Sequence, residues 1–482
     1  MPLSSSRTAL RVCSHKAFGS SRSFSTSILR QKERLVILGS GWGGYEVLRG
    51  VDKKRWDVTM VSANSYFNFT PLLASCAVGT LEFRCAVEPV RRYAPQSTIY
   101  QAWCDKIDFK QKTLTCVPAT PLSSRLERTQ ITTSNTVEDA TKSMQDEEKE
   151  QRQFQLHYDK LVIAVGCYAQ TFGIPGVKEH AYFLKDVRDA RAIRSRILEC
   201  FEEASQPTLS DVDRRKLLNF CIVGGGPTGV EFAAELHDLI ASDIRRSYGP
   251  TLARMARITI YDVAPTILGS FDRSLAKYAE KKFQRDGIIV KLQHHVEKVE
   301  QGILHVKEDG EVPFGVLVWS TGLAPNPLIQ SVTEIEKHAK SGSLFTDDHL
   351  NVIRKDGSVD PDIWAIGDAA VIKDDLLPAT AQVAAQKAKY ATKALNRLAK
   401  SQKLSEPFKF HNQGTLAYLG DWRAIYDRTN VESGPKGKEA GRLAWLLWRS
   451  AYFTRTLSYR NKITVPFYWF LNWIFGRDLS RF

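Results

Sequence analysis

The sequence has no closely spaced pair of cysteines. Its eight cysteines are scattered, and no two of them are separated as C-x-x-C or C-x4-C. Those spacings are typical of metal knuckles and of local redox disulfides, so we expect neither a metal site nor a disulfide of that kind. Most of the cysteines are predicted to be small buried hydrophobic residues.

Long hydrophobic runs are missing as well. The longest uncharged run of the C-terminal part, residues 463–476, is 14 residues long. A helix needs about 20 apolar residues to cross the hydrocarbon core of a bilayer. No apolar segment separates the N-terminal region from the first predicted strand either. We therefore expect no membrane-spanning anchor.

Acidic residues are absent from the N-terminal segment. Residues 1–32 contain many serines and no acid before Glu33. The main basic residues there are Arg7, Arg11, Lys16, Arg22, Arg30 and Lys32. This composition is typical of a mitochondrial transit peptide, whose removal we expect near residues 22–27. An N-terminal segment without a targeting role is the alternative.

The overall amino-acid composition indicates a globular chain. Of its 482 residues, 43% are hydrophobic and 25% are charged, as in ordinary folded proteins. At about 100 to 200 residues for each domain, this length allows two or three domains with full cores. Residues 118–155 are polar, and we expect them to form a solvated insertion.

A glycine-rich segment at residues 220–235, FCIVGGGPTGVEFAAE, is the strongest local motif. An apolar strand runs into Gly224, Gly226 and Gly229, and an alanine-rich helix follows at once. In this strand, turn and helix setting, the spacing G-x-G-x-x-G predicts a dinucleotide site. The first glycine allows a tight turn, the second lets the backbone meet a pyrophosphate, and the third lets the helix pack closely.

A second copy of the motif stands near the N-terminus. The segment LVILGSGWGG places Gly39, Gly41 and Gly44 at the same spacing. The next predicted strand, DVTMVS, ends at Ser62, without the acidic residue that often binds a ribose. Two such units, the second inserted into the first, predict two nucleotide cofactors held face to face.

The strand after the other glycine-rich segment does end in an acid. It is ITIYD, and its last residue is Asp262. A carboxylate there binds the 2′-hydroxyl of a ribose and repels a 2′-phosphate, so we expect NADH in preference to NADPH. The pair of sites then suggests that NADH donates a hydride to a flavin. The alternative is that Asp262 only caps the turn before Pro265.

Three further predicted strands end in small residues. The segments YDKLVIAVG, VLVWSTG and IWAIGDAA bring Gly166, Gly322, Gly367 and Asp368 to their ends. Ligands of open α/β sheets bind at such strand ends, so these residues are candidates for the cofactor crevice.

An alanine-rich helix is predicted for residues 378–400, directly after Gly367 and Asp368. Gln382 and Gln386 are four residues apart in it, so their side chains share a face. We regard them as candidates because of the position of the helix, although a plain surface helix would have the same composition.

The composition changes after a hairpin predicted for residues 408–425. Residues 441–482 combine four tryptophans and seven basic residues with a single acid, Asp478. Basic charge and interfacial aromatics on a short helix predict a segment that lies in the membrane surface. A homodimer interface is the alternative, because aromatics and arginine are also enriched there. A nucleic-acid site is not expected, because the stretches between the charges are too apolar.

Together these segments resemble a known family, the type II (alternative, rotenone-insensitive, non-proton-pumping) NADH:ubiquinone oxidoreductases of fungal and plant mitochondria and of bacteria. The matching segments are LGSGWGG, YFNFTPLL with AVGTLEFR, VGGGPTGVEFAAEL, WSTG, AIGDAA, AQVAAQKA and the aromatic, basic tail. They occur in the family's order and cover nearly the whole chain after residue 32.

The resemblance implies an α/β fold like that of glutathione reductase, with two Rossmann-like dinucleotide-binding domains and a C-terminal membrane-associating segment. The implied parts are the transit peptide (1–32), the FAD-binding domain (33–186 and 341–407), the NADH-binding domain (187–340) and the membrane-anchoring domain (408–482).

The resemblance also implies roles for the candidate residues. FAD would bind at Gly39, Gly41 and Gly44, with Thr70 and Pro71 near its isoalloxazine ring and Asp368 on its ribityl chain. NADH would bind at Gly224, Gly226 and Gly229, with Asp262 on the adenosine ribose and Gly322 near the nicotinamide. Glu231 is similar to a family glutamate placed near the nicotinamide, although an acid in a first helical turn would also serve the helix dipole. Gln382 and Gln386 match a helix that borders both the flavin and the quinone.

The implied activity is oxidation of NADH, with hydride transfer to FAD and two-electron reduction of ubiquinone at the inner mitochondrial membrane. No proton would be pumped. The enzyme would be peripheral, and the expected lack of an anchor favours the matrix face. The family often has glutamate where this chain has Asp262, but aspartate keeps the charge. No EF-hand loop occurs in the sequence, so calcium control is not expected.

Two other functions are alternatives to this activity. A sulfide:quinone or ferredoxin reductase has the same fold, and sulfide chemistry would need cysteines near the flavin, for which Cys76 and Cys167 are candidates. A flavoprotein of the apoptosis-inducing type would bind NADH to switch its association with nucleic acid or partners. It would show slow quinone turnover and steeply salt-dependent DNA binding.

Overall fold

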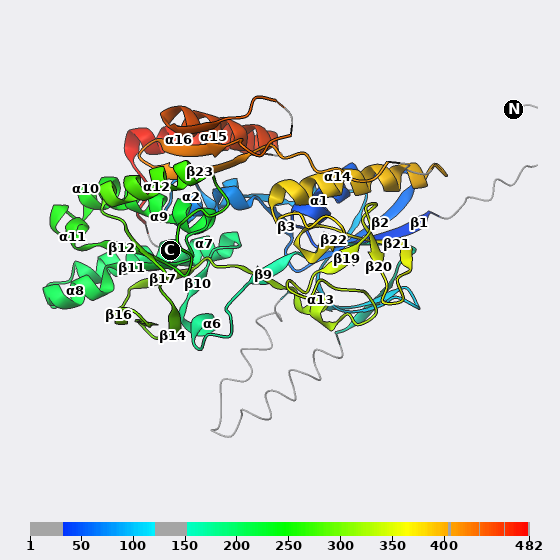
Figure 1. Cartoon of the computed structure of the whole chain (residues 1–482), viewed down its shortest axis with the longest axis horizontal. Helices are drawn as coiled ribbons and strands as arrows, with labels where there is room; N and C mark the ends of the chain where they lie inside the picture. The colour runs from blue at the N-terminus through cyan, green and yellow to red at the C-terminus, as the bar shows by residue number, and fades with distance from the viewer. Residues whose placement is uncertain (1–31, 121–151, 403–405, 433, 457, 481–482) are drawn as a thin grey trace, which may run out of the picture. The chain divides into compact units, whose positions relative to one another are not determined.

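The computed structural model describes residues 32–120, 152–402, 406–432, 434–456 and 458–480 (Figure 1). The predicted transit peptide, apart from Lys32, lies outside these residues. So does most of the predicted polar insertion, because residues 121–151 are not described.

The larger sheet has ten strands, and its centre is parallel. In spatial order its strands are β22 (Ala370–Ile372), β19 (Leu344–Thr346), β20 (Asn351–Ile353), β21 (Val359–Ala365), β8 (Lys160–Ile163), β1 (Glu33–Leu38), β2 (Trp56–Ser62), β5 (Thr98–Asp108), β6 (Thr113–Pro118) and β7 (Phe154–His157). Strands β21, β8, β1, β2 and β5 run parallel to one another. Their carboxyl ends therefore meet at one edge of the sheet, where open α/β sheets bind ligands.

Two helices from distant parts of the chain pack together beside this sheet. They are α1 (Trp42–Gly50) and α14 (Ala381–Leu398) (Figure 1). The side chain of Asn396 accepts from the Asp52 N–H at 2.8 Å and donates to the Gly50 carbonyl at 2.9 Å. A Cβ at Gly50 would lie 2.6 Å from Cγ2 of Thr392, so glycine allows the close approach. The late helix α14 thus belongs to the unit that α1 opens.

The second sheet has five strands and is parallel throughout. In spatial order they are β10 (Tyr182–Phe183), β17 (Val316–Trp319), β11 (Asn219–Val223), β12 (Arg257–Asp262) and β13 (Ile289–Leu292). All of β11 and β17 is buried, as expected for strands covered on both faces. Helices α7 (Val187–Ala204), α9 (Pro227–Leu239) and α12 (Arg273–Asp286) pack on this sheet.

Small sheets and short helices complete the two units. Strands β14 (Val296–Glu300), β15 (Ile303–Val306) and β16 (Gly310–Pro313) form one antiparallel sheet, and β3 (Tyr66–Asn68) pairs with β4 (Val87–Pro89). The short helices are η1 (Thr70–Leu72), α2 (Leu73–Ala77), η2 (Phe83–Cys85), α3 (Val90–Tyr93), α6 (Val177–His180), α8 (Asp211–Leu217), η3 (Ile240–Ile244), α10 (Arg245–Ser247), α11 (Pro250–Met255), α13 (Pro327–Ser331) and η4 (Gly367–Ala369). Strand β9 (Cys167–Ala169), after β8, pairs with β18 (Leu323–Pro325), after β17, so this pair joins the two units.

The chain ends in an antiparallel sheet and two helices. These are β23 (Thr415–Gly420), β24 (Arg423–Asp427), β25 (Lys438–Gly441), α15 (Arg442–Arg455) and α16 (Tyr459–Phe475). The predicted hairpin is present, but it starts later than residue 408, because residues 407–414 form no strand. Strand β23 packs on α9, and α15 packs on β24. The largest buried cluster extends from the first unit to Trp448 and Trp469, so the tail is part of the core.

Candidate functional site

A cleft with a volume of about 1690 Å³ lies against both glycine-rich segments. Its lining includes these predicted site residues: Gly39, Gly41, Thr70, Pro71, Gly166, Glu231, Gly367, Asp368 and Gln382. The other predicted residues, Gly44, Gly224, Gly226, Gly229, Asp262, Gly322 and Gln386, lie outside this lining. The volume exceeds the roughly 300–1,000 Å³ of an ordinary small-molecule pocket, so the cleft has room for more than one ligand.

The first glycine-rich loop combines two tightly packed glycines with an open one. Gly39 has φ +99°, and a Cβ there would lie 2.3 Å from the Ala164 carbonyl oxygen. A Cβ at Gly44 would lie 1.9 Å from the Gly39 oxygen. At Gly41, by contrast, no non-adjacent described atom would come within 4 Å of a Cβ. The loop is therefore held close to β8 and α1, while the backbone of Gly41 faces open space.

The second loop repeats this arrangement. Gly224 has φ +114°, and a Cβ there would lie 2.5 Å from the Ser320 carbonyl oxygen. A Cβ at Gly229 would lie 2.0 Å from the Gly224 oxygen, whereas Gly226 again faces open space within the described residues. No described side chain caps the helix that starts after Gly41 or Gly226. Unsatisfied N–H groups at a helix N-terminus bind anions, so both loops suit a pyrophosphate.

The carboxylate of Asp262 holds the second loop in place. Its Oδ2 accepts from the Gly225 N–H at 2.5 Å, and its Oδ1 accepts from the Ala264 N–H at 2.7 Å. The turn-capping role that was the alternative for Asp262 is thus present. Each carboxylate oxygen has a second lone pair, so this bonding leaves capacity for ribose hydroxyls.

Asp368 lies in a hydrogen-bonded chain with Cys167 and Lys185, a grouping that no local sequence pattern predicts. The Cys167 thiol donates to its Oδ2 at 3.0 Å, and Lys185 Nζ lies 3.1 Å from the Cys167 sulfur. All three residues line the cleft. Burial, and then the Asp368 charge, raises the pKa of Cys167 to about 12. Cys167 is therefore a protonated thiol at neutral pH, and the nucleophilic form of cysteine is scarce.

Glu231 is a buried acid at the cleft. Its Oε1 accepts from the backbone N–H of Tyr418 at 3.0 Å and from Trp448 Nε1 at 3.1 Å. Burial raises the pKa of Glu231 to about 7. The helix begins at Pro227, so Glu231 lies beyond the first turn, and the helix-dipole explanation for this residue is wrong. Its two partners come from the C-terminal part, which no local motif indicates.

Both predicted glutamines hold the loop before β23. Gln382 Nε2 donates to the Gly414 carbonyl at 3.3 Å, and its Oε1 accepts from the Gln413 N–H at 2.6 Å. Gln386 makes the same pair of bonds with the His411 backbone, at 2.9 and 3.0 Å. They share a face, as predicted, but Gln382 is the one of the two that lines the cleft. Both attach the C-terminal part to α14.

Family comparisons agree with this architecture. The chain matches the family described as "Pyridine nucleotide-disulphide oxidoreductase" over residues 33–388 and the "NDH2 C-terminal domain" over residues 412–478. It is 38% identical to "Probable NADH dehydrogenase" of Dictyostelium discoideum, over 94% of this chain and 92% of the relative. It is 37% identical to "Internal alternative NAD(P)H-ubiquinone oxidoreductase A1, mitochondrial" of Arabidopsis thaliana, over 94% of this chain and 86% of the relative.

The chain belongs to the type II, or alternative, NADH:ubiquinone oxidoreductases. The solved NDH2 of Plasmodium falciparum in complex with NADH superimposes with a TM-score of 0.80 at 25% identity, and the match covers 93% of this chain and all of that one. The predicted family is confirmed, and so is the α/β fold of the pyridine nucleotide-disulphide oxidoreductases. A sulfide:quinone oxidoreductase of Aquifex aeolicus, at 15% identity and a TM-score of 0.64 over 92% and 96% of the two chains, shares the fold alone.

The cysteines also do not favour the sulfide rival. Cys167 lines the cleft of this type II oxidoreductase, but Cys76 is fully buried and lies outside the lining. The two residues named as candidates for sulfide chemistry are thus not exposed together at the site.

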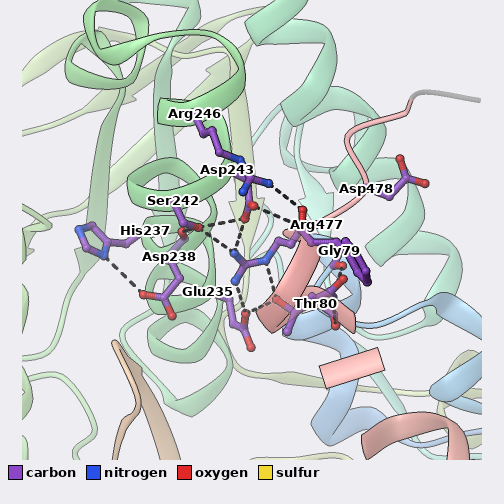
Figure 2. A network of polar contacts seen from close by, with 12 residues as sticks. Gly79, Thr80, Glu235, His237, Asp238, Ser242, Asp243, Arg246, Arg477 and Asp478 are labelled. Carbon is purple, nitrogen blue, oxygen red and sulfur yellow. Dashed lines mark hydrogen bonds and ion pairs between the residues drawn. The ribbon is translucent and has the colours of Figure 1, made fainter. Parts of the chain in front are cut away.

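The NDH2-type tail is fastened to both units by a buried charge network (Figure 2). Arg477 donates to Asp243 at 2.8 Å and to the Thr80 hydroxyl at 2.9 Å, and it lies 3.6 Å from the Glu235 carboxylate. Glu235 also accepts from Ser75 at 2.6 Å. Burial raises the pKa of Glu235. The arginine thus neutralises acids of α9 and η3 and contacts the loop after α2.

A second basic residue of the tail is enclosed by aromatic rings. The guanidinium carbon of Arg449 lies 4.5 Å from the ring centre of Trp445 and 4.3 Å from that of Trp469. This sandwich joins α15 to α16 by cation–π contacts. Arg449 and Arg477 therefore serve the packing of the tail, which its basic composition did not reveal.

Proposed function

We propose that this chain oxidises NADH and reduces ubiquinone, with FAD as its resident cofactor and without pumping protons. The observation that carries the proposal is the shared cleft, to which α9 of the second unit, the carboxyl edge of the first sheet and α15 of the tail all contribute. A donor site and an acceptor site can therefore meet at one place. Two-electron chemistry between them would come from FAD when it is bound.

The first unit fits FAD. Gly41 presents open backbone at the uncapped start of α1, beside Gly166 and Thr70 in the lining. Trp42 Nε1 donates to the Thr70 hydroxyl at 3.1 Å, which fixes η1 against the loop. Asp368 is positioned by Cys167 to accept a hydroxyl. Gly41 would hold the pyrophosphate, Thr70 would lie near the ring system, and Asp368 would bind the ribityl chain.

The second unit fits NADH. Gly226 presents the open backbone, and Asp262 supplies the negative charge that disfavours a 2′-phosphate. The Gly322 carbonyl accepts from the Gln170 N–H at 2.9 Å, which holds the segment between β17 and β18 against the end of β9. We propose that Glu231, with a pKa of about 7, holds or releases the proton that accompanies quinone reduction.

The tail carries an apolar face that we propose lies in the surface of the inner mitochondrial membrane. Five apolar or aromatic residues of α16, each between 46% and 87% exposed, form one stripe: Tyr459, Ile463, Phe467, Phe470 and Ile474. Their spacing of three or four residues places them on one side of the helix. Among the described residues, no helix is long and apolar enough to cross a bilayer. An apolar helix face with aromatics and exposed basic residues nearby suits the interfacial region.

We propose the matrix face for the enzyme. The relatives named internal are 36% to 37% identical to this chain, whereas those named external are 31% to 33% identical. A homodimer is also proposed, with the tail as its contact, because aromatics and arginine favour interfaces. Light scattering of the detergent-solubilised enzyme tests the oligomeric state.

Turnover with a short-chain ubiquinone tests the activity. The purified protein, loaded with FAD, should oxidise NADH at a rate that depends on the quinone. Absence of quinone-dependent oxidation in the FAD-loaded protein would refute the proposal. Intact and opened mitochondria, given NADH that cannot cross the inner membrane, distinguish the two faces. Activity that appears only after opening supports the matrix face.

A further inference from the structure

Two cysteines on consecutive strands, Cys104 and Cys116, lie opposite each other in the larger sheet. The seven described cysteines are free thiols, and five of them are buried: Cys76, Cys85, Cys116, Cys200 and Cys221. Cys104 in β5 is half-buried, and its partner in the antiparallel ladder with β6 is Cys116. Eleven residues separate its members, so the pair has neither the C-x-x-C nor the C-x4-C spacing.

The register of the two strands suits a disulfide. Residues directly opposite in an antiparallel ladder have Cα atoms about 4.5 to 5.5 Å apart, and their side chains point to the same face. Disulfides need a Cα separation of about 4.4 to 6.8 Å. Cys116 and Cys104 also belong to the same apolar cluster, Cys116 within it and Cys104 packed against it. The register shifts between Cys104 and Lys106, and such an irregularity locally disrupts the ladder beside the thiol.

The surroundings make the two thiols unequal. Cys116 is fully buried, whereas Cys104 lines the cleft next to the exposed Trp103. The Cys104 thiol donates to the Lys106 carbonyl at 3.5 Å. Hydrogen bonding to the neighbouring Cys116 thiol, and then burial, raises the pKa of Cys104. Cys104 therefore rests as a protonated thiol, and it is the one of the two that lines the cleft.

We propose that Cys104 and Cys116 are a redox site that closes into a disulfide when a hydroperoxide enters the cleft. The sulfur of Cys104, once deprotonated, attacks an oxygen of hydrogen peroxide. An S–O bond forms, the O–O bond breaks, and the leaving hydroxide takes up the proton as water. The sulfur of Cys116 then displaces the hydroxyl from the Cys104 sulfenic acid, so that an S–S bond forms, the S–O bond breaks and a second water leaves.

The balance of this reaction is two thiols and one peroxide giving one disulfide and two waters, with two electrons passed from sulfur to oxygen. A dithiol reductant reverses it by thiol–disulfide exchange. Because the thiolate is the attacking form, the raised pKa of Cys104 makes the pair slow at neutral pH. It thus responds to sustained exposure to peroxide. The product ties β5, which lines the cleft, to β6.

Peptide mapping of the full-length protein tests this proposal. The folded protein is incubated with hydrogen peroxide, and its remaining thiols are alkylated in denaturant. The protein is then digested, and the masses of the peptides are measured by mass spectrometry. We expect a peptide pair that contains Cys104 and Cys116, two mass units lighter than the two free peptides, and we expect dithiothreitol to remove it. Continued alkylation of both cysteines in peroxide-treated folded protein would overturn the proposal, as would cross-links spread over other cysteines.

Variants separate the two thiols. In Cys116→Ala, dimedone should trap a sulfenic acid at Cys104 that the wild type does not accumulate. In Cys104→Ala, Cys116 should still be alkylated after treatment with the peroxide concentration that cross-links the wild type. Cys200→Ala is the matched control, since Cys200 is a buried thiol of α7, and it should form the Cys104–Cys116 cross-link like the wild type. Equal sulfenic acid at Cys104 in wild type and Cys116→Ala would contradict the closing step. The wild-type mapping decides the proposal even if a variant fails to fold.

Discussion

Glycines at different positions of the two glycine-rich loops have different surroundings. Gly229 lies against the Gly224 oxygen, whereas Gly226 faces open space and has an extended backbone at φ −72° and ψ 177° that any residue adopts. We therefore propose that Gly229 is needed for folding and that Gly226 is needed for ligand binding.

Alanine substitutions separate these two demands. Gly226→Ala should change the free energy of unfolding by less than about 0.5 kcal/mol but weaken NADH binding at least about tenfold. Gly229→Ala should destabilise the protein by about 3 kcal/mol or more, because its Cβ meets fixed backbone. Urea unfolding and NADH titration measure the two effects. Equal loss of stability in both variants would contradict this assignment.

Glu231 should make stability depend on pH. Its pKa is about 7 in the folded protein, against an ordinary value of 4.5. Between these values the folded state holds a proton that the unfolded state has released, so stability falls as pH rises from about 4.5 to about 7. Glu231→Gln removes this loss and should be up to about 3 kcal/mol more stable than wild type above pH 7. The two proteins should converge near pH 4.

The same substitution, Glu231→Gln, should lower quinone-reductase activity although it raises stability. A glutamine keeps the acceptor for Tyr418 and Trp448 but cannot exchange a proton. We expect quinone reduction to fall at least about tenfold in Glu231→Gln, with little change in the KM for NADH. Unchanged turnover would remove the proposed proton role and leave the stability effect standing.

The charge of Asp262 should decide the choice between the two nicotinamide cofactors. Asp262→Asn should raise the KM for NADH about tenfold or more, while the KM for ubiquinone stays near the wild-type value. The preference over NADPH should shrink, since a 2′-phosphate would no longer be repelled. Asp262→Glu restores the charge and is the matched control. Steady-state kinetics with both cofactors measure these changes, and an unchanged KM for NADH would refute the assignment.

At the scale of elements, α16 has one buried face and one exposed apolar face. Asn461, Val465 and Trp469 are buried against the rest of the chain, whereas the stripe that contains Ile463, Phe467 and Phe470 is exposed. A surface helix of a water-soluble protein normally exposes polar residues on its outer side.

Removing the apolar side chains should therefore weaken membrane binding without unfolding the protein. The triple variant Ile463→Ser, Phe467→Ser, Phe470→Ser should bind vesicles of anionic phospholipid and phosphatidylcholine about 100-fold or more weakly, because each side chain contributes about 1.5 to 3 kcal/mol when buried. Val212, Val263 and Leu376 are about as exposed, and their triple replacement by serine is the control. Vesicle flotation measures binding. Equal binding by the α16 variant and wild type would contradict the membrane role.

At the scale of the whole molecule, the network around Arg477 joins three parts of the chain. The arginine comes from the tail, the acids Glu235 and Asp243 from the second unit, and Thr80 from the first (Figure 2). A buried charge that loses its partner is costly, so this single side chain holds much of the assembly in place.

Arg477→Met should leave those acids unpaired and reduce the free energy of unfolding by about 3 to 5 kcal/mol. Adding Glu235→Gln should recover part of this loss, because one buried charge is removed. Arg442→Met is the control, since Arg442 is an exposed arginine of the same tail. Urea unfolding measures all three variants. A cost of Arg477→Met no greater than that of the control would show that the network contributes little to stability.

Local patterns in the sequence were enough to predict two dinucleotide-binding units, and the resemblance of the same segments to a known family implied the family and the α/β fold. Short-range rules explain why: a strand, three glycines at G-x-G-x-x-G and a helix form within 16 residues of 220–235. The acid at the end of β12 and the small residues at the ends of β8, β17 and β21 follow from the same rules. Most cysteines were also correctly predicted to be buried.

Tertiary structure alone decided which distant residues share an environment. Glu231 acquires its raised pKa from burial beside Tyr418 and Trp448, which are 187 and 217 residues away in the sequence. Arg477 meets its acids, and Cys104 meets Cys116, only through packing and strand register. Composition indicates that such side chains exist. Desolvation and charge pairing depend on what lies within a few ångströms, and that is a property of the folded chain.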